Sequence, residues 1–221
     1  MIATTLACVR RASAHPWLIA ALSALGLVAL WYVARRALPY LNLSDAQYGP
    51  YFWPRRWGLL LHVAGGTMAL GVGLIQLWLG LTNRVARLHR ALGKVSLGAI
   101  VVGCSAGFYL AYTIPANAAY AAGLLCLCIA WALTTSMAVF AIRRRDVMQH
   151  REWMMRSYAV TFGFVVFRFG VDALVNWKGM SPLDAQAIMA WAGWTMPLLL
   201  LEPLLQLRRM RASTPSSRLP A

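Results

Sequence analysis

The amino-acid sequence predicts an all-α fold, a polytopic transmembrane helix bundle with six spans. Of the 221 residues, 60% are hydrophobic and only 12% are charged, whereas about 25% of the residues of a soluble domain are charged. The mean hydropathy is +0.59. The apolar residues gather in six runs, each long enough to cross a hydrocarbon core of about 30 Å as a helix. These observations exclude an ordinary water-soluble globule and a disordered chain.

Each predicted span is a run of roughly 20 predominantly apolar residues. The first follows Arg10 and Arg11, so a secretory signal peptide is the competing interpretation. This run is longer than an ordinary signal-peptide core and reaches Arg35 and Arg36 without an A-x-A cleavage site, which favours a membrane helix. The fifth and sixth runs contain ionisable residues. The six spans cover residues 16–34, 57–81, 95–114, 118–142, 153–175 and 187–207.

We expect the second to fifth spans to form a four-helix core. The domain organisation is then a cytoplasmic tail of residues 1–15, a six-helix transmembrane domain of residues 16–207 and a basic cytoplasmic tail of residues 208–221. The second tail is rich in Pro and Ser, which is typical of a disordered segment. The connections between the spans are too short to hold a soluble domain.

The basic residues predict the orientation of the chain. It has 21 Lys and Arg against 6 Asp and Glu, a formal net charge of +15. With six spans, 15 basic residues fall on the side that holds both tails and the second and fourth connections, and five fall on the other side. The positive-inside rule therefore predicts that both termini lie in the cytoplasm. Because these residues are split among short connections, nucleic-acid binding is not expected.

The second span carries a histidine on a face of small residues. Counted from His62, small residues fall at +3, +4, +7 and +11 and Gln76 falls at +14, all on one helical face. Such a face allows a neighbouring helix or a flat cofactor to approach the backbone closely. A hydrogen-bonded histidine in a helix interface and a ligand-binding histidine both remain open. The small residues are Gly65, Gly66, Ala69 and Gly73.

The third and fifth spans each open on a His-Arg pair at the same side of the membrane. His89 heads a stripe of small residues that includes Gly103 and Gly107. His150 heads a polar stripe that runs about 27 Å from His150 to Arg168 and should face the bundle interior rather than lipid. Within this stripe, Arg168 and Asp172 are spaced as an i, i+4 ion pair, although Arg168 could instead extend toward the interface. The polar stripe consists of His150, Ser157, Thr161, Arg168 and Asp172.

Two neutral imidazoles from different helices are what bis-histidine haem ligation requires, so His89 and His150 are candidate ligands of a haem b. The alternative is that the His-Arg pairs anchor the helices against anionic lipid. Glu202 in the sixth span needs a cation, which Arg90, Arg151 or Arg156 could supply. No metal other than haem iron is expected, because carboxylates are scarce beside the histidines. The candidate propionate partners are Arg87, Arg90, Arg151 and Arg156.

A longer pattern consists of His62, Gly66, Gln76, Arg84, His89, Arg90, Gly93 and the block 150–159, HREWMMRSYA. This pattern resembles a bacterial family of predicted integral membrane proteins that is described only as a domain of unknown function. The resemblance covers roughly residues 57–168, and the block at His150 is its most specific part. That family is similar to the transmembrane b-type cytochromes and to ferric-reductase-like four-helix haem bundles. The resemblance implies functional roles for His62, His89 and His150.

The sequence departs from the two-haem cytochromes, which use four histidines on two helix pairs, because its fourth span has no histidine. The resemblance therefore implies at most one haem, on the third and fifth spans. It leaves His62 for another role, such as hydrogen bonding to a quinol or a substrate.

The function expected from the sequence is a b-type haem redox or electron-transfer protein of the bacterial cytoplasmic membrane. Its expected partners are the lipid bilayer and a quinone or a membrane redox protein. The alternative is a non-enzymatic membrane subunit, or a carrier of protons or small molecules, without haem. Walker A, GxGxxG and HExxH patterns do not occur, so nucleotide hydrolysis, Rossmann binding and HExxH-type zinc hydrolysis are not indicated.

Overall fold

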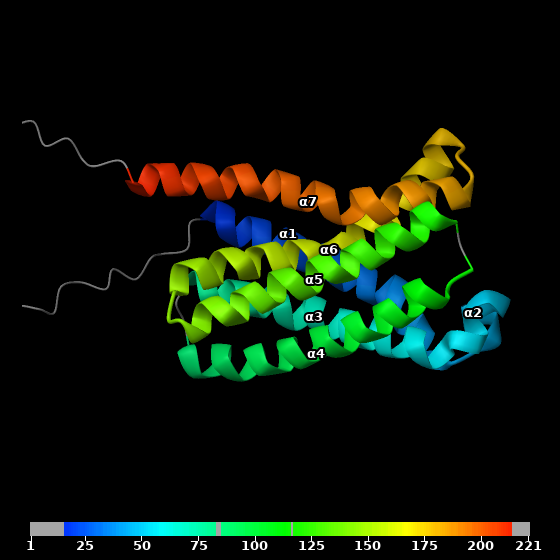
Figure 1. Cartoon of the computed structure of the whole chain (residues 1–221), viewed down its shortest axis with the longest axis horizontal. Helices are drawn as coiled ribbons and strands as arrows, with labels where there is room; N and C mark the ends of the chain where they lie inside the picture. The colour runs from blue at the N-terminus through cyan, green and yellow to red at the C-terminus, as the bar shows by residue number, and fades with distance from the viewer. Residues whose placement is uncertain (1–15, 83–84, 116, 214–221) are drawn as a thin grey trace, which may run out of the picture.

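The computed structural model describes residues 16–82, 85–115 and 117–213, which form helices and the turns between them. Six of these helices are long and apolar enough to cross a membrane, so the prediction of six spans is confirmed for the described chain. The main helices in Figure 1 are α1 (Pro16–Tyr32), α3 (Arg56–Thr82), α4 (Ala86–Thr113), α5 (Ala118–Arg143), α6 (Val147–Lys178) and α7 (Pro182–Ser213).

Two core helices begin well before the apolar runs that predicted them. Helix α4 begins at Ala86 and α6 at Val147, rather than at residues 95 and 153. Asp146 caps α6, since its side chain accepts a hydrogen bond of 3.0 Å from the backbone N–H of Gln149. Hydropathy marks only the part of a helix that lies in hydrocarbon, whereas the polar first turns continue the same helix beyond it. His89 and His150 consequently lie on regular helix.

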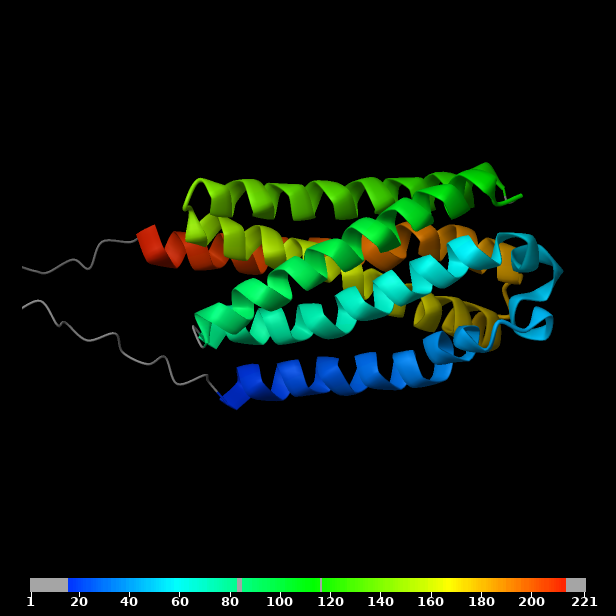
Figure 2. The same cartoon turned by 90° about the horizontal axis from the view of Figure 1, so that it is seen from below.

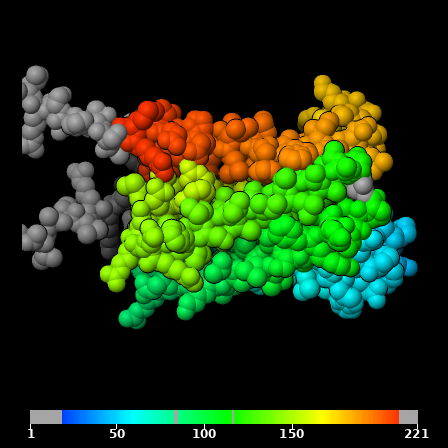
Figure 3. All heavy atoms as spheres, viewed as in Figure 1, coloured from blue at the N-terminus to red at the C-terminus, as the bar shows by residue number. Residues whose placement is uncertain are grey.

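The predicted four-helix core is present. Helices α3, α4, α5 and α6 pack side by side in that cyclic order, with α4 and α6 on a diagonal. Helix α1 covers the junction of α3 and α6 (Figures 1 and 2). Helix α7 lies against α5 and α6, and Figure 3 shows it along the green surface of α5. Helix α1 begins and α7 ends at the same end of the bundle, which we call the terminal face; the opposite end is the distal face.

Helices α3 and α4 pack backbone to backbone. A Cβ added to Gly65 would lie 2.6 Å from the backbone nitrogen of Gly103 and 2.7 Å from the carbonyl oxygen of Ala99. The small-residue faces predicted around His62 and His89 therefore pack against each other. At the centre of the bundle, the side chain of Trp131 is fully buried.

A short, irregular segment that the apolar runs did not predict covers the distal face. It comprises a π-helical turn η1 (Val33–Ala37), the 3-10 turn η2 (Leu38–Asn42), helix α2 (Asp45–Phe52) and the 3-10 turn η3 (Trp53–Arg55). Tyr48 of α2 is buried, and its hydroxyl donates a hydrogen bond of 2.8 Å to the carbonyl of Tyr40. We call this segment the distal cap.

The predicted tails fall mostly outside the described residues. This holds for residues 1–15 and 214–221, whereas residues 208–213 continue α7. The outer surface of the bundle is apolar: Leu27 of α1, Leu133 of α5 and Leu200 of α7 are among the large exposed side chains. Such a surface is suited to lipid.

Candidate functional site

The two histidines of the terminal face lie near each other on the diagonal helices of the core. The ring of His150 lies close enough to His89 for the two rings to interact electrostatically. The Nδ1 atom of His150 lies 2.9 Å from the carbonyl oxygen of Ala138. Because a carbonyl can only accept, Nδ1 carries the proton, and Nε2 of the neutral ring keeps its lone pair.

His89 has fewer hydrogen bonds to its ring than His150. Its backbone carbonyl accepts a hydrogen bond of 2.7 Å from the side-chain amide of Gln76. Its ring atom Nδ1 is buried and has no hydrogen-bond partner among the described residues. A buried polar atom without a partner is unusual in a folded protein and calls for an explanation, such as an ion or a ligand.

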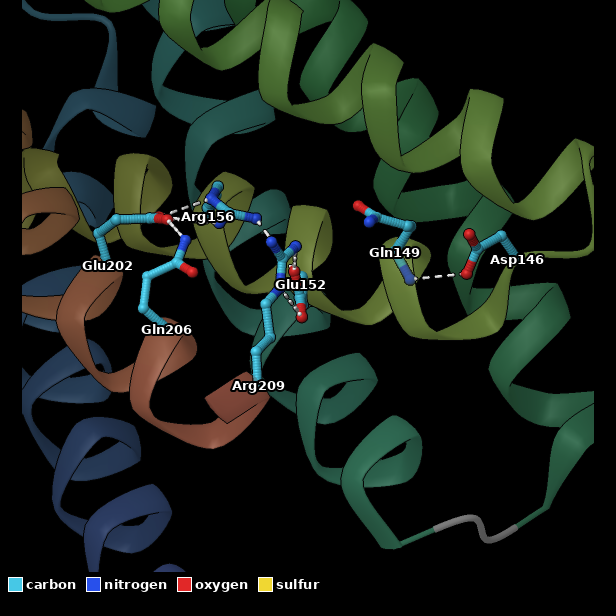
Figure 4. Close-up of polar contacts among 7 residues, drawn as sticks. All are labelled: Asp146, Gln149, Glu152, Arg156, Glu202, Gln206 and Arg209. Carbon is cyan, nitrogen blue, oxygen red and sulfur yellow. Dashed lines mark hydrogen bonds and ion pairs between the residues drawn. The ribbon is translucent and has the colours of Figure 1, made fainter. Parts of the chain in front are cut away.

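An ion-pair network ties α6 to α7 at the same face (Figure 4). Arg156 binds Glu202 through Nε at 3.0 Å and Nη2 at 2.8 Å, so it is the cation that Glu202 requires. Arg156 also lies 3.7 Å from Glu152 of its own helix. Glu152 in turn accepts a hydrogen bond of 2.9 Å from Nε of Arg209.

Glu152 and Arg209 were not predicted as network members. Glu152 is buried among the described residues, and its i, i+4 spacing to Arg156 was the one local signal of this role. Its contact with Arg209 links residues 57 positions apart, which no local pattern indicates.

The middle of the polar stripe on α6 faces the bundle interior, as predicted. Ser157 and Thr161 are buried. Ser157 lies 2.8 Å from the hydroxyl of Thr135, and Thr161 accepts a hydrogen bond of 2.9 Å from the indole N–H of Trp131. These contacts hold α6 against α5, so this part of the stripe serves packing.

The predicted pairing of Arg168 with Asp172 is wrong. Asp172 forms its ion pair with Arg36 of η1. The guanidinium of Arg168 instead lies over the ring of Phe167, at 5.4 Å from its centroid. The i, i+4 spacing permits a pair on one helix, but the distal cap brings a second arginine to the same carboxylate.

His62 borders a cavity of about 290 Å³ in the distal half of the core. Its Nδ1 donates a hydrogen bond of 2.8 Å to the carbonyl of Gly103, and its ring stands edge-on to Phe164 at 5.1 Å. The ring of His62 packs closely against Gly107 of α4, where an added Cβ would lie 3.1 Å from Nδ1. The same reasoning as for His150 leaves Nε2 with its lone pair.

A protein-family model described as a predicted membrane protein (DUF2306) matches residues 59–205. The chain belongs to this family. The region that DUF2306 covers holds nearly all of the core and the histidines His62, His89 and His150, but it leaves out α1 and the distal cap. No curated protein and no solved structure matches the chain. The family membership establishes an integral membrane protein and carries no statement of activity.

Proposed function

We propose that the protein is a redox protein of the bacterial cytoplasmic membrane that holds one haem b between His89 and His150. The observation that carries this proposal is the buried Nδ1 of His89, which has no hydrogen-bond partner among the described residues. Ligation of a haem iron through this atom would give the imidazole a partner.

Two features of the donor set support this proposal. His150 has its Nδ1–H fixed by the Ala138 carbonyl, which is the arrangement that orients a ligating histidine and sets its tautomer. His89 and His150 come from diagonal helices and are electrostatic neighbours. Bis-histidine ligation across a helix bundle uses such a pair.

The arginines of the terminal face divide into two groups. Arg156 is bound by Glu152 and Glu202, so it positions α6 and α7 rather than a propionate. Arg87 and Arg90 are exposed beside His89, and we propose them, with the half-buried Arg151, as propionate partners. A bound haem would supply one-electron chemistry; the chain's own residues would orient the two imidazoles and neutralise the propionates. The proposed electron partner is a membrane quinone or another membrane redox protein.

The test is the absorption spectrum of the full-length protein, expressed with adequate haem and purified in detergent. We expect a Soret band and, on reduction, the sharp α and β bands of a low-spin haem. His89→Ala and His150→Ala should each abolish the low-spin spectrum, whereas His62→Ala should leave it in place.

The absence of a Soret band in folded, monodisperse protein would overturn the proposal. A spectrum that survives in both His89→Ala and His150→Ala would overturn the assignment of these ligands. The first result would favour the alternative of a membrane subunit or carrier without haem.

A further inference from the structure

The distal cavity is a second candidate site, separate from the terminal-face histidines. It lies inside the core between α3, α4, α5 and α6, beneath η1, η2 and α2 of the distal cap. Gly66 and Thr67 line it from α3, Cys128 from α5 and Thr161 from α6. The core helices and the cap therefore both contribute to its walls.

Arginines dominate the charge of this cavity. Arg35, Arg36 and Arg168 line it, and no carboxylate is among its lining residues. Asp172 pairs with Arg36. Among the described residues, no carboxylate forms an ion pair with Arg35 or Arg168.

Arg168 is an exposed arginine within the membrane-spanning length of α6. It lies ten residues before the end of α6, about 15 Å from the distal end of that helix. A charged side chain at membrane depth is costly unless it faces a polar cavity or a counter-charge. Its guanidinium is a hydrogen-bond neighbour of the Tyr32 hydroxyl and lies within electrostatic range of His62 and Tyr120, and none of these three groups is an anion at neutral pH.

The remaining walls are mostly apolar and aromatic, and they set the size of the ligand. A volume of about 290 Å³ corresponds to about ten water-sized heavy atoms, at roughly 30 Å³ each. That is enough for one short chain or one ring system and too little for the two acyl chains of a phospholipid. The aromatic lining residues are Tyr32, Tyr40, Phe52, Tyr120, Phe164 and Phe167.

We propose that the distal cavity binds a small amphipathic carboxylic acid, with its carboxylate on Arg168 and its apolar body among the aromatic walls. His62 keeps an unprotonated Nε2 at the cavity and accepts a hydrogen bond from a hydroxyl of the ligand, where it has one. This site does not depend on haem, and its test succeeds or fails independently of the spectrum.

The probe is radiolabelled octanoate, measured by equilibrium dialysis against the full-length protein in phosphatidylcholine nanodiscs. Empty discs give the part of the signal that comes from lipid partitioning, and 1-octanol is the neutral analogue of matched length. We expect saturable octanoate binding and a Kd at least about tenfold higher for Arg168→Gln, since a charge-assisted hydrogen bond is lost. Octanol binding should be unchanged in this variant.

Two further variants make the result specific. Arg144→Gln removes an exposed arginine of the terminal face, which lies over Phe140, and should bind octanoate like the unaltered protein. Gly66→Leu should abolish binding of both probes, because Gly66 lines the cavity and a Cβ there meets no atom within 4 Å. The added side chain therefore fills the cavity without a clash at its first atom.

Equal octanoate affinity in Arg168→Gln and the unaltered protein would overturn the proposal. So would octanoate binding that survives in folded Gly66→Leu. Loss of octanoate binding in discs that contain phosphatidylglycerol would identify a lipid phosphate as the occupant and overturn the choice of a free acid.

Discussion

At the scale of single residues, two neighbouring glycines of α3 have opposite surroundings. Gly65 contacts the backbone of α4, and an added Cβ would lie 2.6 Å from Gly103. At Gly66 the added Cβ meets nothing within 4 Å. We expect Gly65→Ala to destabilise the protein by about 1–3 kcal/mol, because two helix backbones must move apart. Gly66→Ala should be nearly neutral.

This difference can be measured by reversible unfolding in mixed micelles of a mild detergent and sodium dodecyl sulfate. The pair is matched, since both changes add one methyl group to adjacent positions of the same helix. A Gly65→Ala variant as stable as Gly66→Ala would contradict the close contact of α3 with α4.

His62 and His150 share one arrangement in different halves of the bundle. Each ring donates from Nδ1 to a backbone carbonyl of a neighbouring helix, Gly103 of α4 or Ala138 of α5. Each therefore presents Nε2 with a lone pair, as a metal ligand or a hydrogen-bond acceptor. The surroundings then separate their roles, since His150 lies near a second imidazole and His62 lies beside a cavity lined with arginine.

At the scale of elements, the ion-pair network decides how firmly α7 is held on the core. Glu152 interacts with both Arg156 and Arg209, and its side chain is only 8% exposed. Glu152→Ala leaves two arginines without this carboxylate, so we expect a loss of about 1–3 kcal/mol in the free energy of unfolding. Gln206→Ala is the control, because it removes one exposed hydrogen bond to Glu202 and should cost less than about 0.5 kcal/mol.

The same detergent unfolding assay distinguishes these outcomes. Proteolysis at the C-terminal end of α7 gives a second readout, because α7 should open locally in Glu152→Ala before the core unfolds. If Glu152→Ala and Gln206→Ala are equally stable and equally resistant, the network does not hold α7.

The elements also show what the sequence could predict. Apolar runs located six spans and the four-helix core, because lipid exposure imposes a long, uniform signal on each helix. The helical period placed Ser157 and Thr161 toward the interior, since that period depends only on local geometry. The helical period could not predict the ion pair of Asp172 with Arg36 or that of Glu152 with Arg209, because both contacts depend on how distant segments pack. The distal cap was missed because its short turns mix polar and aromatic residues without a period.

At the scale of the whole molecule, the two candidate sites lie at opposite ends of one core. The histidine pair belongs to the first turns of α4 and α6, and the cavity lies toward the ends of the same helices. The two ends differ in how their arginines are paired. At the terminal face, Glu152 and Glu202 form ion pairs with Arg156. At the cavity, Arg35 and Arg168 have no ion-pair partner among the described residues. Ion pairs therefore hold Arg156 at the terminal face, whereas Arg35 and Arg168 leave the cavity open to an anion.

The distribution of the basic residues predicts how the two ends of the bundle are oriented in the membrane. Fifteen lie on the side of the tails and five on the other, so we propose that the terminal face is cytoplasmic. A green fluorescent protein fused after residue 221 should then fluoresce, and alkaline phosphatase fused there should be inactive. The same reporters placed after Gly179, in the exposed turn between α6 and α7, should give the reverse. Active phosphatase at the C-terminus would contradict the proposed orientation. The proposed haem site would then lie on the outer side of the membrane and the acid-binding cavity toward the cytoplasm.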